Sequence, residues 1–131
     1  MSKSRKPNTG KHFSNAHALL EEAFNQLPEP RLQWNAAGWI LLALGENAAR
    51  SESFPEVIRY LQEAVYAPGT IGNPWLHLRF GQAQLEVNDQ QRALNELMRA
   101  YLGAGKEIFS ALDPKYFRFL QSKAQPPHGG W

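Results

Sequence analysis

The sequence predicts an all-α protein built from helical hairpins that stack side by side. Three observations predict this class. Apolar residues recur at spacings of three and four along most of the 131-residue chain, which is the spacing of helices that bury one face. The breaks between these segments carry Pro, Gly, Asn or Asp, which start and stop helices. One hairpin-length segment, 73–103, matches an upstream segment at an offset of 36 residues.

The segment 73–103 is predicted to form two helices folded back on each other. Asn73 can cap the first helix, and Pro74 can occupy its first position, where a missing N–H costs nothing. Asn88 and Asp89 end that helix and can cap the second one. Small residues are expected where the two backbones approach closely: Gly81, Ala83, Ala93 and Ala100.

The upstream copy matches this hairpin at the positions where its helices would meet. The matched pairs are Trp39 with Trp75, Leu44 with Phe80, Gly45 with Gly81, Val57 with Ala93, Leu61 with Leu97, and Ala64 with Ala100. Together with Tyr101 in the second copy and Pro68 after the first, this pattern resembles the tetratricopeptide repeat family. The resemblance implies a right-handed stack of antiparallel hairpins, about two and a half repeats, with a C-terminal capping helix.

Helices are also predicted on both sides of the matched segments. One begins at Phe13 and stops at Pro28, and its expected buried stripe is Ala16, Leu19, Leu20, Ala23 and Phe24. The next is expected as one helix over 31–50, and another begins after Ser53 and ends at 67–69. A short helix or turn is expected over 106–112. Asp113-Pro114 starts the last helix, whose expected inward residues are Tyr116, Phe117 and Leu120.

The two ends of the chain are expected to lie outside the helical domain, which we place at 12–122. The leader 1–11 carries four basic residues and no acid: Lys3, Arg5, Lys6 and Lys11. Removing these four from the fourteen Lys and Arg leaves ten against twelve Asp and Glu, so the rest of the chain has a formal charge of −2. We expect the leader to be disordered and solvated, although it could touch nucleic acid. The segment 123–131 is expected to be a flexible tail.

The residues of the chain do not suggest an active site. His12, His17, His77 and His128 are dispersed, and the pairs Glu21-Glu22 and Glu96/Glu107 are expected on solvated faces. With no cysteine, no close His/acid spacing and no glycine-rich phosphate loop, we expect no catalytic residue, metal ligand or cofactor, and no small-molecule substrate. No apolar run suits a membrane span or a signal peptide, so we expect a cytoplasmic protein without a membrane partner.

The resemblance implies a binding surface on the first helix of each hairpin. Carried over position by position, its residues are Trp39, Leu42, Glu46 and Arg50 in one copy and Trp75, Leu78, Arg79, Gln82 and Glu86 in the other. Exposed tryptophans beside mixed charges would suit a protein interface, but both tryptophans could equally belong to the core. Since they occupy the positions of the Lys and Asn of the family's carboxylate clamp, we do not expect that clamp.

The predicted function is therefore that of a non-enzymatic scaffold that binds a protein partner. Among small stand-alone repeat proteins, the chain is similar to immunity proteins, which would make the partner a toxin or effector domain that the scaffold neutralises. Two alternatives stay open at this point: a general adaptor or co-chaperone that binds peptide segments, and a nucleic-acid-associated factor that uses the basic leader.

Overall fold

The computed structural model describes the backbone of residues 9–131 and the side chains of residues 15–131. The basic residues Lys3, Arg5 and Lys6 of the expected leader therefore lie outside the described residues. Within the described range the regular secondary structure is entirely helical. The elements are α1 (Thr9–Asn25), η1 (Arg31–Gln33), α2 (Asn35–Arg50), α3 (Phe54–Ala64), α4 (Pro74–Glu86), α5 (Gln90–Ala104), η2 (Lys106–Ala111) and α6 (Lys115–Lys123). The all-α class is confirmed.

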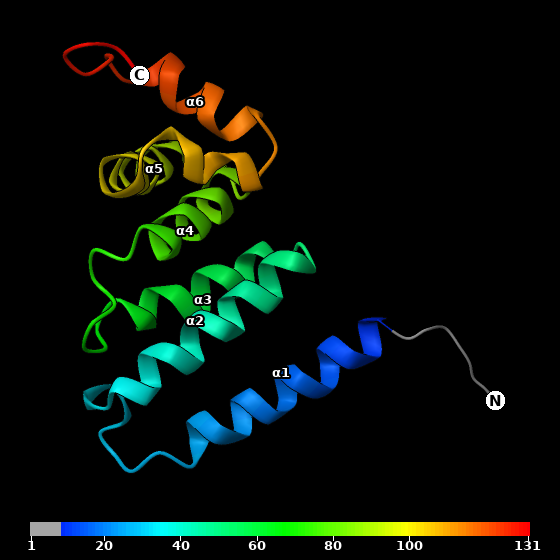
Figure 1. Ribbon diagram of the computed structural model, residues 1–131. Coiled ribbons are helices and arrows are strands. Elements are labelled where there is room, and N and C mark those ends of the chain that lie inside the picture. Colours follow the sequence, from blue (N-terminus) through cyan, green and yellow to red (C-terminus); the bar gives the residue numbers. More distant parts are fainter. Residues whose placement is uncertain (1–8) are drawn as a thin grey trace.

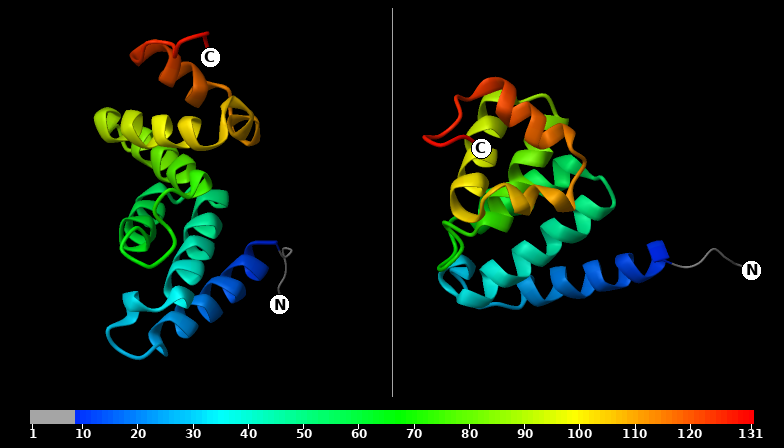
Figure 2. Two further views of the ribbon diagram at one scale, coloured as in Figure 1. Left: turned by 60° about the vertical axis from the view of Figure 1, so that its left-hand side comes forward. Right: turned by 45° about the horizontal axis from the view of Figure 1, so that its top comes forward.

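The helices are stacked in chain order, with α1 at one end and α6 at the other (Figures 1 and 2). Each α-helix packs mainly on its neighbours along the chain. In addition, α2 and α4, which α3 separates in the sequence, contact each other directly. This order brings the first helices of the two central hairpins to one side of the stack. None of the helices over 9–131 is long and apolar enough to cross a membrane.

The two central hairpins, α2–α3 and α4–α5, turn with the same backbone geometry. After the first helix of each pair a residue adopts positive φ, at Glu52 (58°) and at Asn88 (69°). The next N–H reaches back to a carbonyl five residues earlier, from Ser53 to Ala48 (2.9 Å) and from Asp89 to Gln84 (2.8 Å). This is the Schellman type of helix end. Every one of these positions differs from its counterpart by 36 residues, as the sequence comparison predicts.

The helices within each hairpin approach closely at the same matched position. A methyl group added to Gly45 would lie 2.6 Å from a methyl carbon of Leu61, and one added to Gly81 would lie 2.7 Å from Cγ of Leu97. Small or branched residues beside these contacts have no exposed surface: Val57, Ala64, Ala83, Ala93 and Ala100. The prediction that small residues line the contact between the two helices is confirmed.

The predicted helix starts in the second hairpin are also confirmed. The Asn73 side chain accepts hydrogen bonds from the backbone N–H groups of Trp75 and Leu76, and Pro74 is the first residue of α4. The Asp89 side chain accepts one from the N–H of Arg92 at the start of α5. Each cap satisfies donors that a helix end leaves without a partner.

The core consists of two clusters along the stack. One lies between α2, α3 and α4 and includes Leu41, Leu44, Tyr60, Leu61, Leu76 and Phe80. The other lies between α4, α5, η2 and α6 and includes Leu78, Leu97, Phe109, Tyr116 and Leu120. Because α4 contributes to both clusters, it is covered on more than one face, which explains why its apolar residues do not form a single stripe.

The segment 31–50 is not one helix, contrary to the prediction. A short 3-10 helix, η1, is separated from α2 by Trp34, whose backbone is extended (φ −92°, ψ 138°). The Trp34 indole donates a hydrogen bond to the carbonyl of Pro28 at 2.8 Å. This contact holds the side chain against the preceding loop. The spacing of apolar residues does not predict such a contact, so the break in the helix was missed.

Three of the five residues of the stripe predicted for α1 are exposed. Leu20 and Phe24 pack against the α2–α4 cluster, whereas Ala16, Leu19 and Ala23 face solvent. The helix also begins at Thr9, four residues before the predicted start at Phe13. It lies at the end of the stack, so only one side of it has a neighbour (Figure 1).

The C-terminal segment differs from the flexible tail that we expected, because its last residue packs on the domain. The Trp131 ring lies edge-on to Tyr101 at 5.2 Å and to Phe117 at 5.9 Å between ring centroids. A turn closed by a 2.8 Å hydrogen bond from the N–H of Gly130 to the carbonyl of Pro127 directs the chain back. The isolated tryptophan has no periodic partner in the sequence, so pattern analysis missed this contact.

Candidate protein-binding surface

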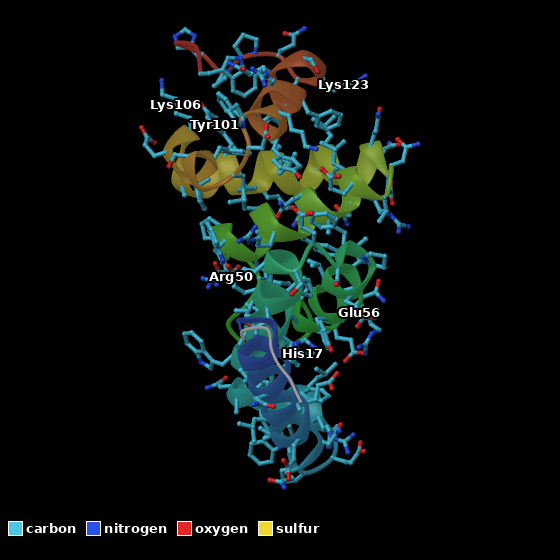
Figure 3. The ribbon with its side chains drawn as sticks, turned by 90° about the vertical axis from the view of Figure 1, so that its right-hand side faces the viewer. His17, Arg50, Glu56, Tyr101, Lys106 and Lys123 are labelled. Atoms are coloured by element: carbon cyan, nitrogen blue, oxygen red, sulfur yellow. The ribbon has the colours of Figure 1, made fainter. Side chains whose placement is uncertain are left out.

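The residues predicted to bind a partner lie along α2 and α4, which run next to each other on one side of the stack. Figure 3 shows the side chains around this region, with Arg50 labelled at the end of α2. The exposed members are Trp39, Arg50 and Glu86, and the half-buried members are Leu42, Glu46, Trp75 and Arg79. Gln82 is buried at 8% exposure but reaches a surface hollow described below.

Leu78 does not lie on this surface, and its assignment as a contact residue is wrong. It has no exposed area and packs in the second core cluster with Leu97 and Phe109. Its counterpart Leu42 is half-buried because α2 has no η2 and α6 covering the equivalent face. Two positions with the same spacing therefore differ in burial because their neighbours differ.

A carboxylate on α2 joins the two hairpins beneath this surface. One oxygen of Glu46 accepts hydrogen bonds from the indole N–H of Trp75 and from Nε of Arg79, both at 2.9 Å. Its other oxygen accepts from Nη2 of Arg79 at 2.9 Å and from Nε of Arg50 at 3.1 Å. The paired contacts of Arg79 form the bidentate geometry that fixes both side chains.

The environment of Glu46 favours its ionised form. Burial of the carboxyl raises its pKa, but the hydrogen bonds and positive charge of Arg79, with further hydrogen bonds from Trp75 and Arg50, outweigh that effect. The pKa of Glu46 is consequently lower than its ordinary value. The ionised carboxylate thus holds the two cationic side chains at the junction of α2 and α4.

The same contacts show that the two matched tryptophans have different surroundings. The sequence did not decide whether either of them lies in the groove or in the core. Trp75 is half-buried, its N–H is bonded to Glu46, and the Arg79 guanidinium lies 5.1 Å from its ring centroid. Trp39 is 74% exposed, and its indole N–H forms no hydrogen bond with any residue in the described part of the chain. Trp75 therefore helps to hold the hairpins together, while Trp39 is available to a partner.

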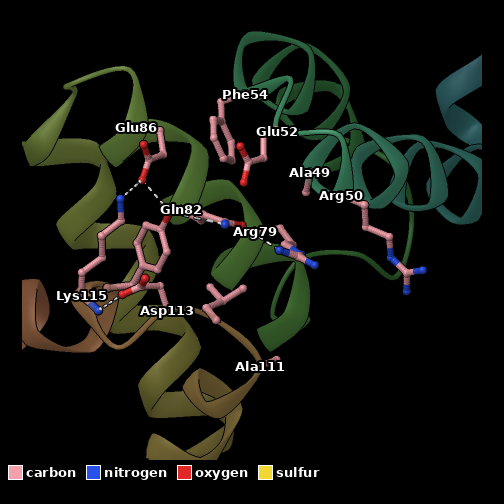
Figure 4. A pocket seen from close by; sticks show the side chains of 12 residues that line it. Ala49, Arg50, Glu52, Phe54, Arg79, Gln82, Glu86, Ala111, Asp113 and Lys115 are labelled. Carbon is pink, nitrogen blue, oxygen red and sulfur yellow. Dashed lines mark hydrogen bonds and ion pairs between the residues drawn. The ribbon is translucent and has the colours of Figure 1, made fainter. Parts of the chain in front are cut away.

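A second carboxylate joins α4 to α6. Glu86 accepts an ion-pair hydrogen bond from Lys115 at 2.7 Å and another from the hydroxyl of Tyr116 (Figure 4). These two bonds, opposed by partial burial, lower the pKa of Glu86. Burial, followed by the bond to Glu86, raises the pKa of Tyr116. The sequence placed Lys115 in solvent and Tyr116 in the core, and it contained no signal that both would meet Glu86.

Between these two junctions lies a charged hollow of about 370 Å³ (Figure 4). It is lined by Ala49, Arg50, Glu52, Phe54, Arg79, Gln82, Glu86, Ala111, Leu112, Asp113, Lys115 and Tyr116. Four of the predicted contact residues are among them: Arg50, Arg79, Gln82 and Glu86. Ala49 also lies on α2, whereas the other lining residues belong to the α2–α3 turn, the start of α3, η2, the η2–α6 connection and α6, which the prediction from first helices alone did not include.

A second hollow of about 260 Å³ lies at the other end of α2 and carries no charged residue. It is lined by Asn35, Trp39, Leu42, Pro68, Gly69, Thr70 and Asn73. Two further large apolar residues belong to the connection between α3 and α4 that borders it: Tyr66 is 77% exposed and Ile71 is 73% exposed. Exposed apolar residues grouped in this way are typical of protein-binding surfaces.

His17 and His77 take part in contacts between helices, and two of the expected solvated acids are their neighbours. His77 is buried and lies 2.6 Å from Glu96 on α5. His17 lies 2.8 Å from the hydroxyl of Tyr60, which donates to Glu21 at 2.6 Å. Burial and the bond to Glu21 raise the pKa of Tyr60 to about 12. Glu21 and Glu96 are thus structural partners and do not lie on freely solvated faces.

The fold and this surface define a class of protein: an all-helical stack of hairpins with an exposed aromatic end and a charged end on one side. Among the described residues, no group of three or more His, Asp and Glu side chains could hold a metal ion. Comparisons with protein-family models, with curated proteins and with solved structures gave no match.

Proposed function

We propose that this protein is a non-enzymatic scaffold of the tetratricopeptide repeat type that binds one protein partner along α2 and α4. The observation that carries the proposal is Trp39, a tryptophan with 74% exposure beside a hollow on the predicted contact face. Burying such a side chain in an interface contributes large apolar area at little entropic cost, which is why tryptophans are common interface hot spots.

Two further observations support this proposal. The hairpin turns and the Gly–Leu contacts recur at the same 36-residue offset, which is what repeats of one hairpin unit require. The Glu46 junction holds α2 and α4 in fixed register, so the contact face is preorganised and less entropy is lost when a partner binds. From Trp39 to Arg50 the face extends about 16 Å along α2, long enough for several residues of a partner.

The form of this function that we put forward is neutralisation of a partner enzyme, as in the immunity proteins that the repeat pattern resembles. It requires a tight, stoichiometric complex, since a weak complex would leave free enzyme. General peptide binding by an adaptor would instead show weak, sequence-tolerant association.

The test is co-purification of the full chain from its native host, followed by measurement of stoichiometry and inhibition. We expect one partner protein in a one-to-one complex, lost on Trp39→Ala and retained on Leu102→Ala. Leu102 is a matched control because it is 71% exposed and lines neither hollow. A complex that survives Trp39→Ala would contradict the proposed contact face, and a partner with undiminished activity in the complex would contradict neutralisation.

A further inference from the structure

The uncharged hollow beside Trp39 differs from its surroundings in its chemistry. One-fifth of the chain is charged, yet all seven residues that line this hollow are neutral. The other hollow on the same side is lined by Arg50, Arg79 and Lys115 and by three acids. The uncharged hollow therefore has no complementary charge for an ionised segment, and a bound Lys or Glu would be desolvated without a partner.

Three side chains that line the uncharged hollow have N–H groups that can donate hydrogen bonds: Asn35, Trp39 and Asn73. The Trp39 indole N–H, which can only donate, has no acceptor among the described residues. The Asn73 side-chain oxygen already accepts the N–H groups of Trp75 and Leu76, which leaves its NH₂ group to donate. The Thr70 hydroxyl is bonded to the carbonyls of Ala64 and Ala67. The Asn35 side chain has no partner among the residues described, so its NH₂ group can donate and its oxygen can accept.

A polyproline II segment has the complementary arrangement. Its backbone carbonyls are free because it forms no internal hydrogen bonds, and its proline residues bring no N–H that would need an acceptor. Proline rings pack flat against aromatic side chains, and aromatic grooves that recognise such segments exploit their low conformational entropy. A helix, by contrast, satisfies its own backbone groups and would leave these donors unused.

We propose that the hollow at Trp39 binds an uncharged, proline-rich segment of the partner in the polyproline II conformation. The segment stacks a proline ring on the Trp39 indole and accepts hydrogen bonds from the indole N–H and from the amides of Asn35 and Asn73. This inference rests on the proposed function, because it assigns the chemistry of the partner at one end of the same face.

The test is titration of the full chain with an end-blocked decaproline peptide, with an end-blocked Gly-Ser peptide of equal length as the matched uncharged probe. The indole N–H signals of the four tryptophans report the binding position in a nitrogen–proton correlation spectrum. We expect decaproline to shift the Trp39 signal and the Gly-Ser peptide to leave it unchanged. Binding should weaken at least about tenfold on Trp39→Ala.

Three variants separate stacking, hydrogen bonding and folding. Trp39→Phe keeps an aromatic ring without the N–H and should retain part of the affinity. Asn35→Ala should weaken binding, whereas Leu102→Ala should not. Because Trp39 and Asn35 are exposed, Trp39→Ala and Asn35→Ala should unfold at the same temperature as the native chain. Equal melting temperatures would show that any loss of binding is local.

The inference is overturned if decaproline does not bind at millimolar concentration, if the Gly-Ser peptide binds equally well, or if Trp39→Ala binds decaproline normally. These outcomes are distinguishable from failure of the proposed function. The protein could form a partner complex that depends on Trp39 and yet fail to bind decaproline. That result would support the scaffold function and contradict only the proposed binding of a polyproline II segment.

Discussion

At the scale of single residues, one position of the hairpin turn requires a positive φ, and the two central hairpins place different residues there. Glu52 and Asn88 both adopt positive φ at the end of the first helix. Both residues have a Cβ, but the short asparagine side chain can hydrogen-bond locally and tolerates this conformation, whereas the longer glutamate side chain does not. Glu52 therefore carries a conformational cost that its matched residue mostly avoids.

We predict that Glu52→Gly stabilises the protein by about 1 kcal/mol, because glycine adopts the left-handed conformation without a Cβ penalty. Asn88→Gly should change stability by only a few tenths of a kcal/mol, since asparagine is already tolerated there. Urea unfolding followed by circular dichroism measures both. Equal effects of the two substitutions would show that backbone conformation does not distinguish the two sites.

Glu46 is the residue whose loss should most affect the contact between the hairpins. Glu46→Gln keeps the size of the side chain but removes the charge that strengthens hydrogen bonds from Arg79, Trp75 and Arg50. We expect a loss of about 1.5–3 kcal/mol in the free energy of unfolding. The control is Glu63→Gln, an exposed acid outside both hollows, which should leave stability unchanged within about 0.5 kcal/mol.

At the scale of elements, the close approach of paired helices depends on glycines at equivalent positions. The sequence matched Gly45 with Gly81, and the structure shows the reason: each lies against a leucine of the second helix, Leu61 or Leu97. The surroundings of the two glycines are not identical. The added Cβ of Gly81 would also lie 3.1 Å from the backbone nitrogen of Leu97, whereas that of Gly45 meets only the side chain of Leu61.

We predict that Gly81→Ala destabilises the protein by about 1–3 kcal/mol through overpacking, despite the better helix propensity of alanine. Gly45→Ala should cost less, because the end of a leucine side chain can move and a backbone atom cannot. Thermal unfolding of the two variants side by side tests the order. Stabilisation by Gly81→Ala would mean that α4 and α5 can separate without loss.

The C-terminal segment stabilises the last helices through one aromatic residue. Trp131→Ala removes two edge-to-face contacts, with Tyr101 and Phe117, and we expect a loss of about 1–3 kcal/mol. The tryptophan is only partly buried, so the cost should fall below that of a fully buried aromatic residue. Calorimetric unfolding of the full chain measures it. An unchanged melting temperature would show that the segment is not held on the domain.

At the scale of the whole molecule, two carboxylates join consecutive parts of the stack: Glu46 joins α2 to α4, and Glu86 joins α4 to α6. The pKa of each is lowered in the folded chain. Such a group contributes stability that is fully present above its ordinary pKa and is lost as pH falls through its lower, folded-state pKa.

We therefore predict that the free energy of unfolding falls as the pH drops below about 4.5, the ordinary pKa of these carboxyls. Glu46→Gln and Glu86→Gln should each reduce this dependence on pH, because a glutamine cannot be protonated there. Urea unfolding between neutral and acidic pH measures the slope. A double variant with the full dependence of the native chain would place the acid sensitivity in other groups.

The sequence by itself determined the all-α class, the caps at Asn73 and Asp89, and the matched contacts of the central hairpins. These features depend on local spacing and on residue types that start helices, end them or allow two helices to approach closely. The amino-acid sequence alone therefore contains the required information. Of the residues that it predicted for partner binding, the structure leaves Trp39, Arg50 and Glu86 exposed. The sequence could not identify Leu78 as core, because that depends on cover from η2 and α6.

Only the tertiary structure decided which residues at matched positions of the two hairpins have different surroundings. Trp75 is engaged by Glu46, while Trp39 remains exposed, and Lys115 and Tyr116 reach Glu86 from a helix about thirty residues away in the chain. Trp131 returns to the domain, and three of the five residues of the predicted α1 stripe stay in solvent. In each case the outcome depends on which element lies beside the residue in space, and helical periodicity specifies the face of a residue but not its neighbour.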